Sequence, residues 1–518
     1  MNRQEKALLV FIVALGLAAR VYFLAAFENV FSTEAEAYSK INLVNAWIAH
    51  GKPYPDPNFG PLHTWLIYLL TLPFKDPVLP ARIFSLICGI AAIPVFFFVT
   101  KMIVGKRAAF IAAVLFAFFP VHLRASATSL AEAPYALCFF GGLAAFIACT
   151  HSKKSSYWLL VLSALCFNLA GMLRFEAWLF FPVLCLFALR RGFLKAVGYG
   201  LMLLIFPAVH MYICWKTTGH PMSFGQTSAA SFLLYLPQMP LSYRATAWLV
   251  CFWLGLSPVL AILCMLGMVW GAAAKRGGLI YALFFFPYAL LSYRTIMGMI
   301  DPSLVRYGIV LAAIPLPLAA GFIDAATTKL VKREGLRLAA TVIVCACVMG
   351  LTSWWSYRQA NESQLPDDIR SVAGFLRDQA GENERIILDK RFHPYLVVES
   401  RHDPNLLATL RYDGGPVTDP EEYKAVVTKL FPLSHGHGED ISWGRDIKYY
   451  EHEAFVEMMQ NFDPTMLVLD YESGGNMQAF TIAPEAGEAL MHGRRLTRIL
   501  QVGEFSVFRI EHVEGDES

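Results

Sequence analysis

The sequence predicts a polytopic α-helical membrane protein with about eleven transmembrane helices and a C-terminal α/β domain outside the membrane. Of the 518 residues, 56% are hydrophobic and only 16% are charged, whereas about 25% of the residues in a soluble domain are charged. The charge also changes sign along the chain. Residues 1–358 hold 28 basic and 11 acidic residues, and residues 359–518 hold 15 basic and 29 acidic ones. This composition excludes a cytosolic enzyme, a disordered chain and a small disulfide scaffold.

The boundary between the two predicted domains lies where the apolar segments end. Residues 1–356 form the membrane domain, with a long first outer loop at 27–82, and residues 359–518 form the soluble domain. All ten cysteines lie in apolar segments and show no disulfide framework or zinc pattern, so they are interpreted as small hydrophobic residues. The basic membrane part favours anionic ligands such as lipid phosphates, while the acidic tail argues against nucleic acid as a partner.

The first apolar run, 7–26, is compatible with a signal peptide or an uncleaved span. Its length and the many apolar segments that follow favour the span. Because a span needs about 20 apolar residues, the shorter segments below are weaker predictions. The remaining spans are predicted near 83–100, 108–121, 133–150, 157–173, 177–189, 196–215, 246–271, 278–293, 304–323 and 338–356.

The distribution of basic residues orients these spans. With a cytoplasmic N-terminus, every dense basic cluster lies inside, as the positive-inside rule requires. These clusters are Lys101, Lys106 and Arg107; Lys153 and Lys154; Arg190, Arg191 and Lys195; Lys275 and Arg276; and Lys329, Lys332, Arg333 and Arg337. Counting the 14-residue apolar segment Pro61–Phe74 as a span would reverse this pattern. It is therefore interpreted as an interfacial or re-entrant helix on the outer face. We expect a multi-pass protein of the inner (plasma) membrane with a periplasmic C-terminal domain.

The C-terminal part alternates helical and strand patterns, which is typical of a small α/β domain. Helices are predicted at 366–380, 419–430 and 451–461, and strands at Arg385–Leu388, Met466–Asp470, Thr497–Val502 and Phe505–Ile510.

Charged side chains close to the membrane are costly and therefore mark candidate sites. Several lie at the outer face of the predicted topology, although they are far apart in sequence. They are Glu34, Glu36, Glu132, Arg174, Glu176, Arg294, Asp301 and Arg306, with His63 in the first outer loop. Carboxylates can deprotonate an acceptor hydroxyl or hold a divalent cation, and arginines can bind a phosphate through two hydrogen bonds. Together these residue types predict group transfer from a lipid-linked phosphate donor.

Each candidate also has a purely structural interpretation. Glu34 and Glu36 are compatible with a solvated helix start, and Glu132 with a charge at a helix N-terminus. Arg174 and Glu176 are close enough in sequence to pair with each other. Arg306 could extend to the lipid head groups, as long basic side chains do near span ends.

Four motifs resemble those of the GT-C superfamily of membrane glycosyltransferases, especially the branch of protein O-mannosyltransferases and lipid A aminoarabinose transferases. Their order along 1–356 and their shared outward placement carry the resemblance. They are Glu34-Ala-Glu-Ala-Tyr38, Gly60-Pro-Leu-His63, the stretch with Pro120, Arg124 and Glu132, and Arg306-Tyr307 followed by Pro315 and Pro317. The family also has an extracytoplasmic C-terminal domain.

The resemblance implies that a sugar is transferred, with inversion, from a polyprenyl-phosphate carrier to a lipid, glycan or protein acceptor at the outer side of the membrane. It implies that Glu34, or alternatively Glu36, is the catalytic acid site, acting as a base or as part of an acidic pair with Glu132. The donor phosphate would face Arg306, Arg294 and Arg174, and the substrates would be lined by Tyr38, His63 and Tyr307. A divalent cation held by Glu34 and Glu132 is an option within the same scheme.

Two other classes of protein compete with this interpretation. A transporter or flippase of lipid-linked sugars would show repeated halves and charges near the middle of the membrane, and the sequence shows neither clearly. A non-catalytic receptor with an acidic soluble domain would have no need of acidic residues in three outer loops.

Overall fold

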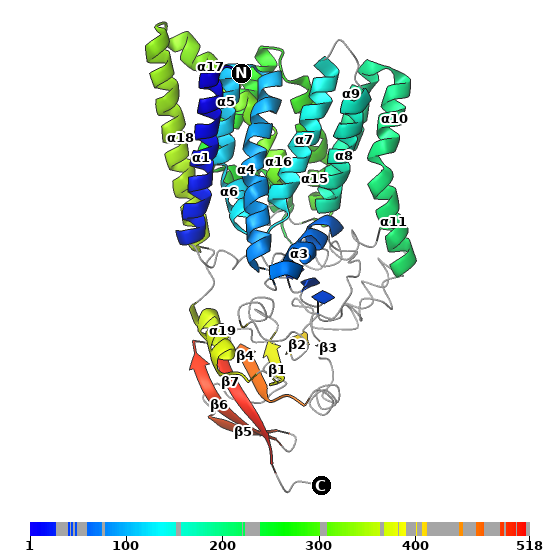
Figure 1. Ribbon diagram of the computed structural model, residues 1–518, viewed down its shortest axis with the longest axis vertical. Coiled ribbons are helices and arrows are strands. Elements are labelled where there is room, and N and C mark those ends of the chain that lie inside the picture. The colour runs from blue at the N-terminus through cyan, green and yellow to red at the C-terminus, as the bar shows by residue number, and fades with distance from the viewer. Residues whose placement is uncertain are drawn as a thin grey trace. The chain divides into compact units, whose positions relative to one another are not determined.

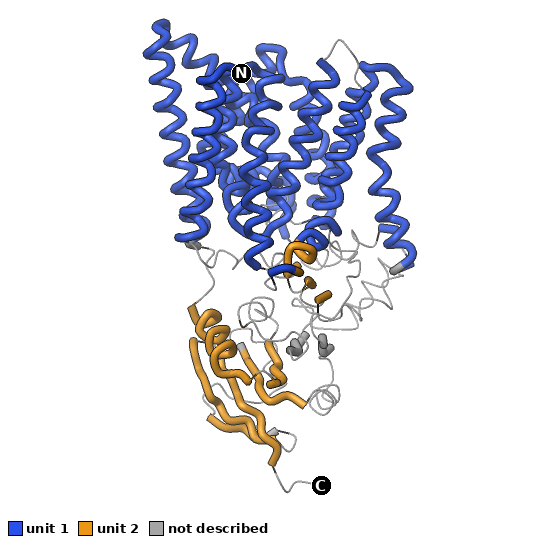
Figure 2. The backbone as a smooth tube through the Cα atoms, in the orientation of Figure 1, with its two compact units in different colours: residues 1–28, 55–66, 73–362 blue, residues 29–54, 67–72, 363–518 orange. Residues whose placement is uncertain are grey.

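In the computed structural model, the chain consists of two compact units. One unit comprises Met1–Glu28, Pro55–Leu66 and Pro73–Glu362, and the other comprises Asn29–Tyr54, Ile67–Leu72 and Ser363–Ser518 (Figure 2). The residues that the structure describes are 1–26, 40–41, 43–44, 47–48, 60–74, 78–151, 157–219, 221–222, 239–300, 308–362, 367–381, 383–389, 400, 407–411, 445–448, 463–470, 487–491, 494–503 and 505–513.

The first unit consists of helices that run largely alongside one another (Figure 1). The α-helices are α1 (Arg3–Ala26), α3 (Pro61–Phe74, whose middle residues belong to the second unit), α4 (Val78–Ile103), α5 (Lys106–Ala117), α6 (Pro120–Ala127), α7 (Glu132–His151), α8 (Tyr157–Leu173), α9 (Phe181–Ala188), α10 (Phe193–Leu203), α11 (Ile205–Thr218), α13 (Leu241–Leu256), α14 (Pro258–Ala273), α15 (Gly278–Ile296), α16 (Ile309–Ala313), α17 (Leu316–Leu330) and α18 (Glu334–Glu362). Two 3₁₀ segments, η2 (Phe175–Phe180) and η3 (Leu189–Arg191), flank α9.

The helices confirm a multi-pass membrane protein, but not the predicted number of eleven spans. Among the described residues, seven helices are long and apolar enough to cross a membrane, and counting two bent pairs raises the number to nine. The predicted span at 157–173 coincides with α8, which has 17 residues and falls short of a full span. The predicted span at 177–189 is divided among η2, α9 and η3.

The predicted continuous span 246–271 is two helices, α13 and α14, that meet at an angle of 113°. The break follows from the sequence Ser257-Pro258. Proline has no N–H group to continue the helical hydrogen bonds, and it keeps the preceding residue out of the helical conformation. Ser257 accordingly has an extended ψ of 152°, while its φ of 75° lies in the left-handed region. The apolar pattern alone did not reveal this break.

A second break, of 56°, separates α5 from α6 at Phe118-Phe119-Pro120. The fully buried Arg20 of α1 holds it. The Arg20 Nη1 donates to the carbonyls of Gly16 at 2.8 Å and Ala117 at 3.0 Å, and Nη2 donates to His122 Nδ1 at 2.9 Å. Because Nδ1 accepts this bond, His122 is the neutral tautomer that carries its proton on Nε2. An arginine in the first helix therefore fixes the connection that leads to α7.

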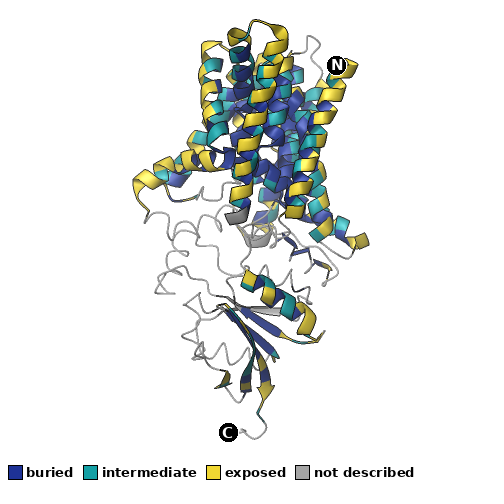
Figure 3. Cartoon of the chain, turned by 90° about the vertical axis from the view of Figure 1, so that its left-hand side faces the viewer, coloured by how far each residue is buried: buried dark blue, intermediate teal, exposed yellow. Residues whose placement is uncertain are grey.

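Aromatic side chains from helices distant in sequence pack together in the core of the first unit. Phe96 of α4 and Phe116 of α5 stack with ring centroids 4.3 Å apart, and Phe140 of α7 meets both rings edge-on. Edge-to-face pairs of this kind contribute about 0.5–1.5 kcal/mol beyond their burial. Buried residues accordingly concentrate in the interior of the bundle, while the outward helical faces are exposed (Figure 3).

Within its described residues, the second unit contains a sheet of seven strands in the order β3-β2-β1-β4-β7-β6-β5. Its strands are β1 (Ile386–Asp389), β2 (Leu407–Arg411), β3 (Arg445–Lys448), β4 (Met466–Asp470), β5 (Glu488–Met491), β6 (Arg494–Val502) and β7 (Phe505–His512). The pairs β1–β2, β2–β3 and β1–β4 are parallel, and the remaining pairs are antiparallel. The four predicted strands correspond to β1, β4, β6 and β7, whereas β2, β3 and β5 were not predicted.

Helix α19 (Asp367–Gln379) packs against β6 and β7 and corresponds to the helix predicted at 366–380. The predicted helices 419–430 and 451–461 lie outside the described residues. Near the end of β7, the carboxylate of Asp463 accepts hydrogen bonds from His512 at 3.1 Å and Arg494 at 2.9 Å. These two partners lower the pKa of Asp463.

Candidate active site

Glu132 begins helix α7 and is fully buried. An acidic residue in the first turn is favoured there because backbone N–H groups at a helix N-terminus attract negative charge. The segment before it is anchored to α4, since Ser85 Oγ donates to the carbonyl of Leu130 at 3.1 Å. The carboxylate of Glu132 is thus held at one end of the bundle.

Arg174 lies directly after α8 and connects that helix to η2. Its own N–H still bonds to the carbonyl of Ala170, but its φ of −150° and ψ of 126° are extended, so the α-helix ends there. The chain turns at this point, and the turn directs the guanidinium toward the start of α7.

The Arg174 guanidinium bridges two carboxylates. Nη1 donates to Glu132 Oε1 at 2.6 Å, and Nη2 and Nε donate to the two oxygens of Glu176 at 2.8 and 3.2 Å. Arg174 is 6% exposed and Glu132 is 0% exposed, whereas Glu176 is 23% exposed. Hydrogen bonds between charged groups are roughly twice as strong as those between neutral groups, and the two-point contact with Glu176 also fixes the plane of the guanidinium. These contacts hold Arg174 in one orientation.

Two further residues belong to this cluster. Arg294, near the end of α15, experiences the charge of Glu176, and α15 packs against η2. The charges of Glu132, Arg174 and Glu176 all act on Tyr135, which is one turn into α7 and 2% exposed. With both carboxylates ionised, the two arginines balance them. Sequence reasoning did not select Tyr135, although its position three residues after Glu132 puts it on the same face of the helix.

The Gly60-Pro-Leu-His63 motif contacts the chain directly beside Arg174. A Cβ placed on Gly60 would lie 2.5 Å from the carbonyl oxygens of both Met172 and Leu173. Only glycine allows so close an approach, because any side chain would collide with backbone atoms that cannot move aside. This explains the glycine in the motif and joins the motif to the last turn of α8.

His63 follows in the first turns of α3 and is fully buried. Its ring lies 6.4 Å from that of Phe84, measured between centroids. The helix α3 has 14 residues, and its axis runs across those of the long helices (Figure 1). It is not among the candidate spans, as the sequence predicted.

Of the predicted candidates, the structure therefore brings together Glu132, Arg174 and Glu176, and the charge of Glu176 also acts on Arg294. Of the other candidates, His63 lies three residues after Gly60, which contacts the backbone directly before Arg174. The remaining ones lie outside the described residues: Glu34, Glu36, Tyr38, Asp301, Arg306 and Tyr307. Arg20 is a buried charge that sequence reasoning missed, because a single arginine near the end of an apolar run resembles a head-group contact.

The described part of the chain does not fit a resident metal ion. No group of three or more His, Cys, Asp or Glu side chains gathers within it. One oxygen of Glu132 already accepts a hydrogen bond from a guanidinium, and a cation so close opposes the binding of another. The predicted use of Glu34 and Glu132 for a metal depends on Glu34, which is outside the described residues.

Chemically, the cluster combines a positioned guanidinium with carboxylates in a water-poor environment. A second arginine lies nearby, so the site can balance the charge of a phosphate that arrives or leaves. A tyrosine hydroxyl provides a further hydrogen-bonding group.

Comparison with known proteins identifies the fold. The family model of dolichyl-phosphate-mannose-protein mannosyltransferases matches residues 55–215, a range that includes Gly60, Glu132 and Arg174. A comparison with curated protein sequences gives no match. Among solved structures, ArnT from Cupriavidus metallidurans bound to undecaprenyl phosphate superposes with a TM-score of 0.59 at 14% identity, over 96% of this chain and 97% of ArnT. The chain has the fold of the GT-C glycosyltransferases.

Other solved structures with this fold are also similar. The apo form of the same ArnT gives a TM-score of 0.60 at 13% identity, with 96% and 97% coverage. The archaeal oligosaccharyltransferase AglB from Archaeoglobus fulgidus, in complex with an inhibitory peptide and a dolichol-phosphate, gives 0.53 at 12% identity. That match covers 92% of this chain and 71% of AglB. The predicted resemblance to the GT-C superfamily is thus confirmed at the level of the fold.

Proposed function

We propose that this GT-C protein transfers a sugar from a polyprenyl-phosphate carrier to an acceptor hydroxyl at the outer side of the membrane, with inversion at the anomeric carbon. The observation that carries the proposal is the buried cluster in which Arg174 is held between Glu132 and Glu176, with Arg294 nearby. A buried cluster of this kind is costly to assemble, so a membrane protein without use for it would gain by replacing it with apolar residues.

The location of the cluster supports a lipid-linked donor. Glu132 begins α7, while Arg174 and Arg294 follow or end helices whose opposite ends carry basic loops. By the positive-inside rule the cluster then faces the outside, at the depth where lipid phosphates lie. ArnT and AglB, which share the fold, were each solved with a polyprenyl phosphate bound.

The proposed step is a single displacement. The acceptor oxygen attacks the anomeric carbon and forms the new glycosidic bond, its proton passes to a carboxylate, and the bond to the phosphate oxygen breaks. Polyprenyl phosphate leaves with the bonding electrons. We assign the carboxylate to Glu34, from the resemblance of its motif, and phosphate binding to Arg306 and Arg294. Arg174 would supply positive charge at the same place, with Glu132 and Glu176 as its positioning residues.

The test uses the purified full chain in lipid nanodiscs with radiolabelled polyprenyl-phosphate sugars. The donors carry mannose, glucose or aminoarabinose, and the acceptors are lipid A, a glycan and a serine-rich peptide. We expect label to move from at least one donor to one acceptor. We expect Glu34→Gln to lower this rate by about 100-fold or more, as the loss of a general base does, with unchanged unfolding. Arg306→Ala should weaken donor binding.

Glu334→Gln is the matched control, because this exposed carboxylate lies at the start of α18 among the basic loops. It should leave the rate unchanged. Full activity of Glu34→Gln would remove the assigned base, and unchanged donor affinity of Arg306→Ala would remove the assigned phosphate contact. Movement of intact donor across sealed vesicles without cleavage would instead indicate a flippase and refute the proposed function.

A further inference from the structure

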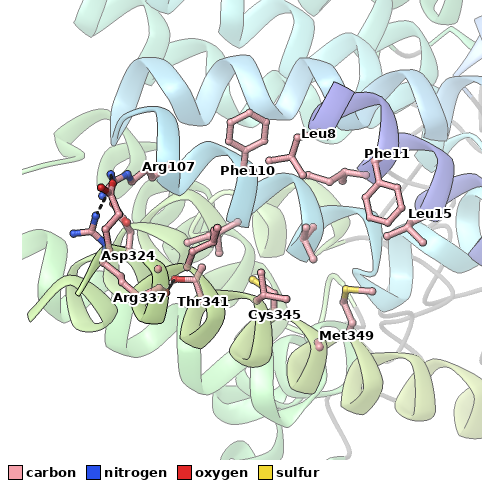
Figure 4. A pocket seen from close by; sticks show the side chains of 18 residues that line it. Leu8, Phe11, Leu15, Arg107, Phe110, Asp324, Arg337, Thr341, Cys345 and Met349 are labelled. Carbon is pink, nitrogen blue, oxygen red and sulfur yellow. Dashed lines mark hydrogen bonds and ion pairs between the residues drawn. The ribbon is translucent and has the colours of Figure 1, made fainter. Parts of the chain in front are cut away.

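An apolar groove of about 540 Å³ lies between α1 and α18. It is at the end of the helical bundle opposite to the cluster of Glu132, Arg174 and Glu176. Leu8, Phe11 and Leu15 of α1 line one wall, Cys345 and Met349 of α18 line the other, and Phe110 of α5 forms the floor (Figure 4). Among the described helices, α18 packs on α5, α6, α14 and α17, which leaves the space beside α1 open.

One end of the groove is charged. Arg107, Asp324 and Arg337 gather there and are separated from Leu15 and Met349 at the apolar end (Figure 4). Glu334 accepts hydrogen bonds from Arg107 at 2.9 Å and Arg337 at 3.3 Å. Within the described part of the chain, the half-buried Asp324 accepts a hydrogen bond at its backbone carbonyl from Thr327, but its carboxylate makes no ion pair or side-chain hydrogen bond. The charged end thus offers two guanidinium groups and two carboxylates, one of which lacks a cationic partner.

The length of the groove matches one leaflet of a bilayer. From Leu338 to Met349 the helix α18 rises about 17 Å, at about 1.5 Å per residue. The hydrocarbon core of a bilayer is about 30 Å thick, so one leaflet contributes about 15 Å. A transmembrane helix from a partner protein would need a groove of about twice this length, whereas a single acyl chain fits it.

We propose that this groove binds a phospholipid whose head group carries both a phosphate and a primary ammonium, with one acyl chain between α1 and α18. Arg107 and Arg337 bind the phosphate, and Asp324 accepts hydrogen bonds from the ammonium. The charged end lies among the basic loops, so the lipid belongs to the cytoplasmic leaflet. The site is separate from the proposed donor site, and its test does not depend on catalysis.

The head-group test compares phosphatidylethanolamine, phosphatidylcholine and phosphatidylglycerol that have the same acyl chains. The full chain is purified with each lipid in a detergent, and native mass spectrometry measures the bound lipid. We expect one phosphatidylethanolamine per chain. Phosphatidylcholine should bind about tenfold more weakly, because its ammonium has the same charge but no N–H donors. Asp324→Asn should abolish the difference in binding between phosphatidylethanolamine and phosphatidylcholine. Arg107→Gln should weaken the binding of all three lipids.

The acyl-chain test uses neighbouring residues of α18 as a matched pair. Val342 lines the groove and is 57% exposed, whereas Ile343 is 62% exposed and does not line it. Val342→Trp should reduce lipid binding at least tenfold, and Ile343→Trp should not. Equal binding of the three lipids, equal effects of the two tryptophan variants, or retention of a polyprenyl phosphate in place of the phospholipid would each overturn the proposal.

Discussion

Replacing Arg174 and Glu132 separately should destabilise the protein to different extents. Arg174 Nη1 donates to Glu132 Oε1 at 2.6 Å, and this carboxylate is fully buried. Arg174→Gln therefore removes the guanidinium that contacts this buried carboxylate. Glu132→Gln, by contrast, leaves Arg174 with the two-point contact to Glu176.

The expected magnitudes follow from these contacts. Breaking a buried ion pair so that a charge remains uncompensated costs about 3–5 kcal/mol. Losing one charge-assisted hydrogen bond while the charge keeps another partner costs about 1.5–3 kcal/mol. We expect Arg174→Gln to fall in the first range and Glu132→Gln in the second. The double variant should cost less than the sum of the two single changes, because neither charge remains.

The free energy of unfolding is measured by titrating the purified protein with sodium dodecyl sulfate in mixed micelles. A thiol-reactive fluorophore reports unfolding, because none of the ten cysteines forms a disulfide and Cys347 alone is exposed. Tyr199→Phe, which removes a buried hydrogen bond with Ser163, is a control for an ordinary neutral contact. This pairing of Arg174 with the two carboxylates would be refuted if the two single variants lowered the free energy of unfolding equally. It would also be refuted if the double variant lowered it by the full sum of the two single changes.

Three further outcomes follow from other contacts. Gly60→Ala should destabilise the protein by about 1–3 kcal/mol and slow transfer, because the new Cβ collides with the carbonyls that end α8. Gly350→Ala, whose Cβ meets nothing within 4 Å, should do neither when both are measured in the same assays. Arg20→Met should lower the free energy of unfolding by about 2 kcal/mol or more, because it removes the donors to buried acceptors. Chemical unfolding of the variant will measure this loss. Because the pKa of Asp463 is lowered in the folded state, its ionised form stabilises the protein above about pH 4, and this stabilisation is lost as the pH falls through the lowered pKa. Asp463→Asn should therefore make the free energy of unfolding less dependent on pH in the acidic range, as measured by unfolding at a series of pH values.

The sequence was sufficient for the class of fold, because long apolar runs and the asymmetry of basic loops are properties of composition. In the second unit, β4 was predicted at its observed bounds, Met466–Asp470, since it is a continuous apolar run that ends at an acidic residue. The strands β2, β3 and β5 were missed because their sequences, LATLR, RDIK and EALM, lack a continuous apolar run like that of β4, so their strand structure depends on pairing with neighbouring strands. The bend at Ser257-Pro258 was missed because α13 and α14 are both apolar, and a hydropathy pattern does not show where the helix axis changes direction.

The site was predicted in part. Glu132 and Arg174 were selected separately from the cost of charge at the membrane, but they are 42 residues apart and nothing in the sequence shows that they pair. The local alternative, a pair between Arg174 and Glu176, is also present in the structure, so the two interpretations are compatible. The close approach of Gly60 to the end of α8 could not be predicted, because a sequence motif contains no information about which distant backbone atoms it contacts.

The contact of Arg20 with the α5–α6 break has a consequence for how the protein is made. Its acceptor at Ala117 is 97 residues further along the chain. At about 5–20 residues per second, the ribosome needs roughly 5–20 s to synthesise that stretch. During this interval the guanidinium has no native acceptor on α5 and would be expensive to leave in lipid. The first helix must therefore be retained by the insertion machinery, or remain shifted toward the aqueous interface, until the third hydrophobic segment arrives.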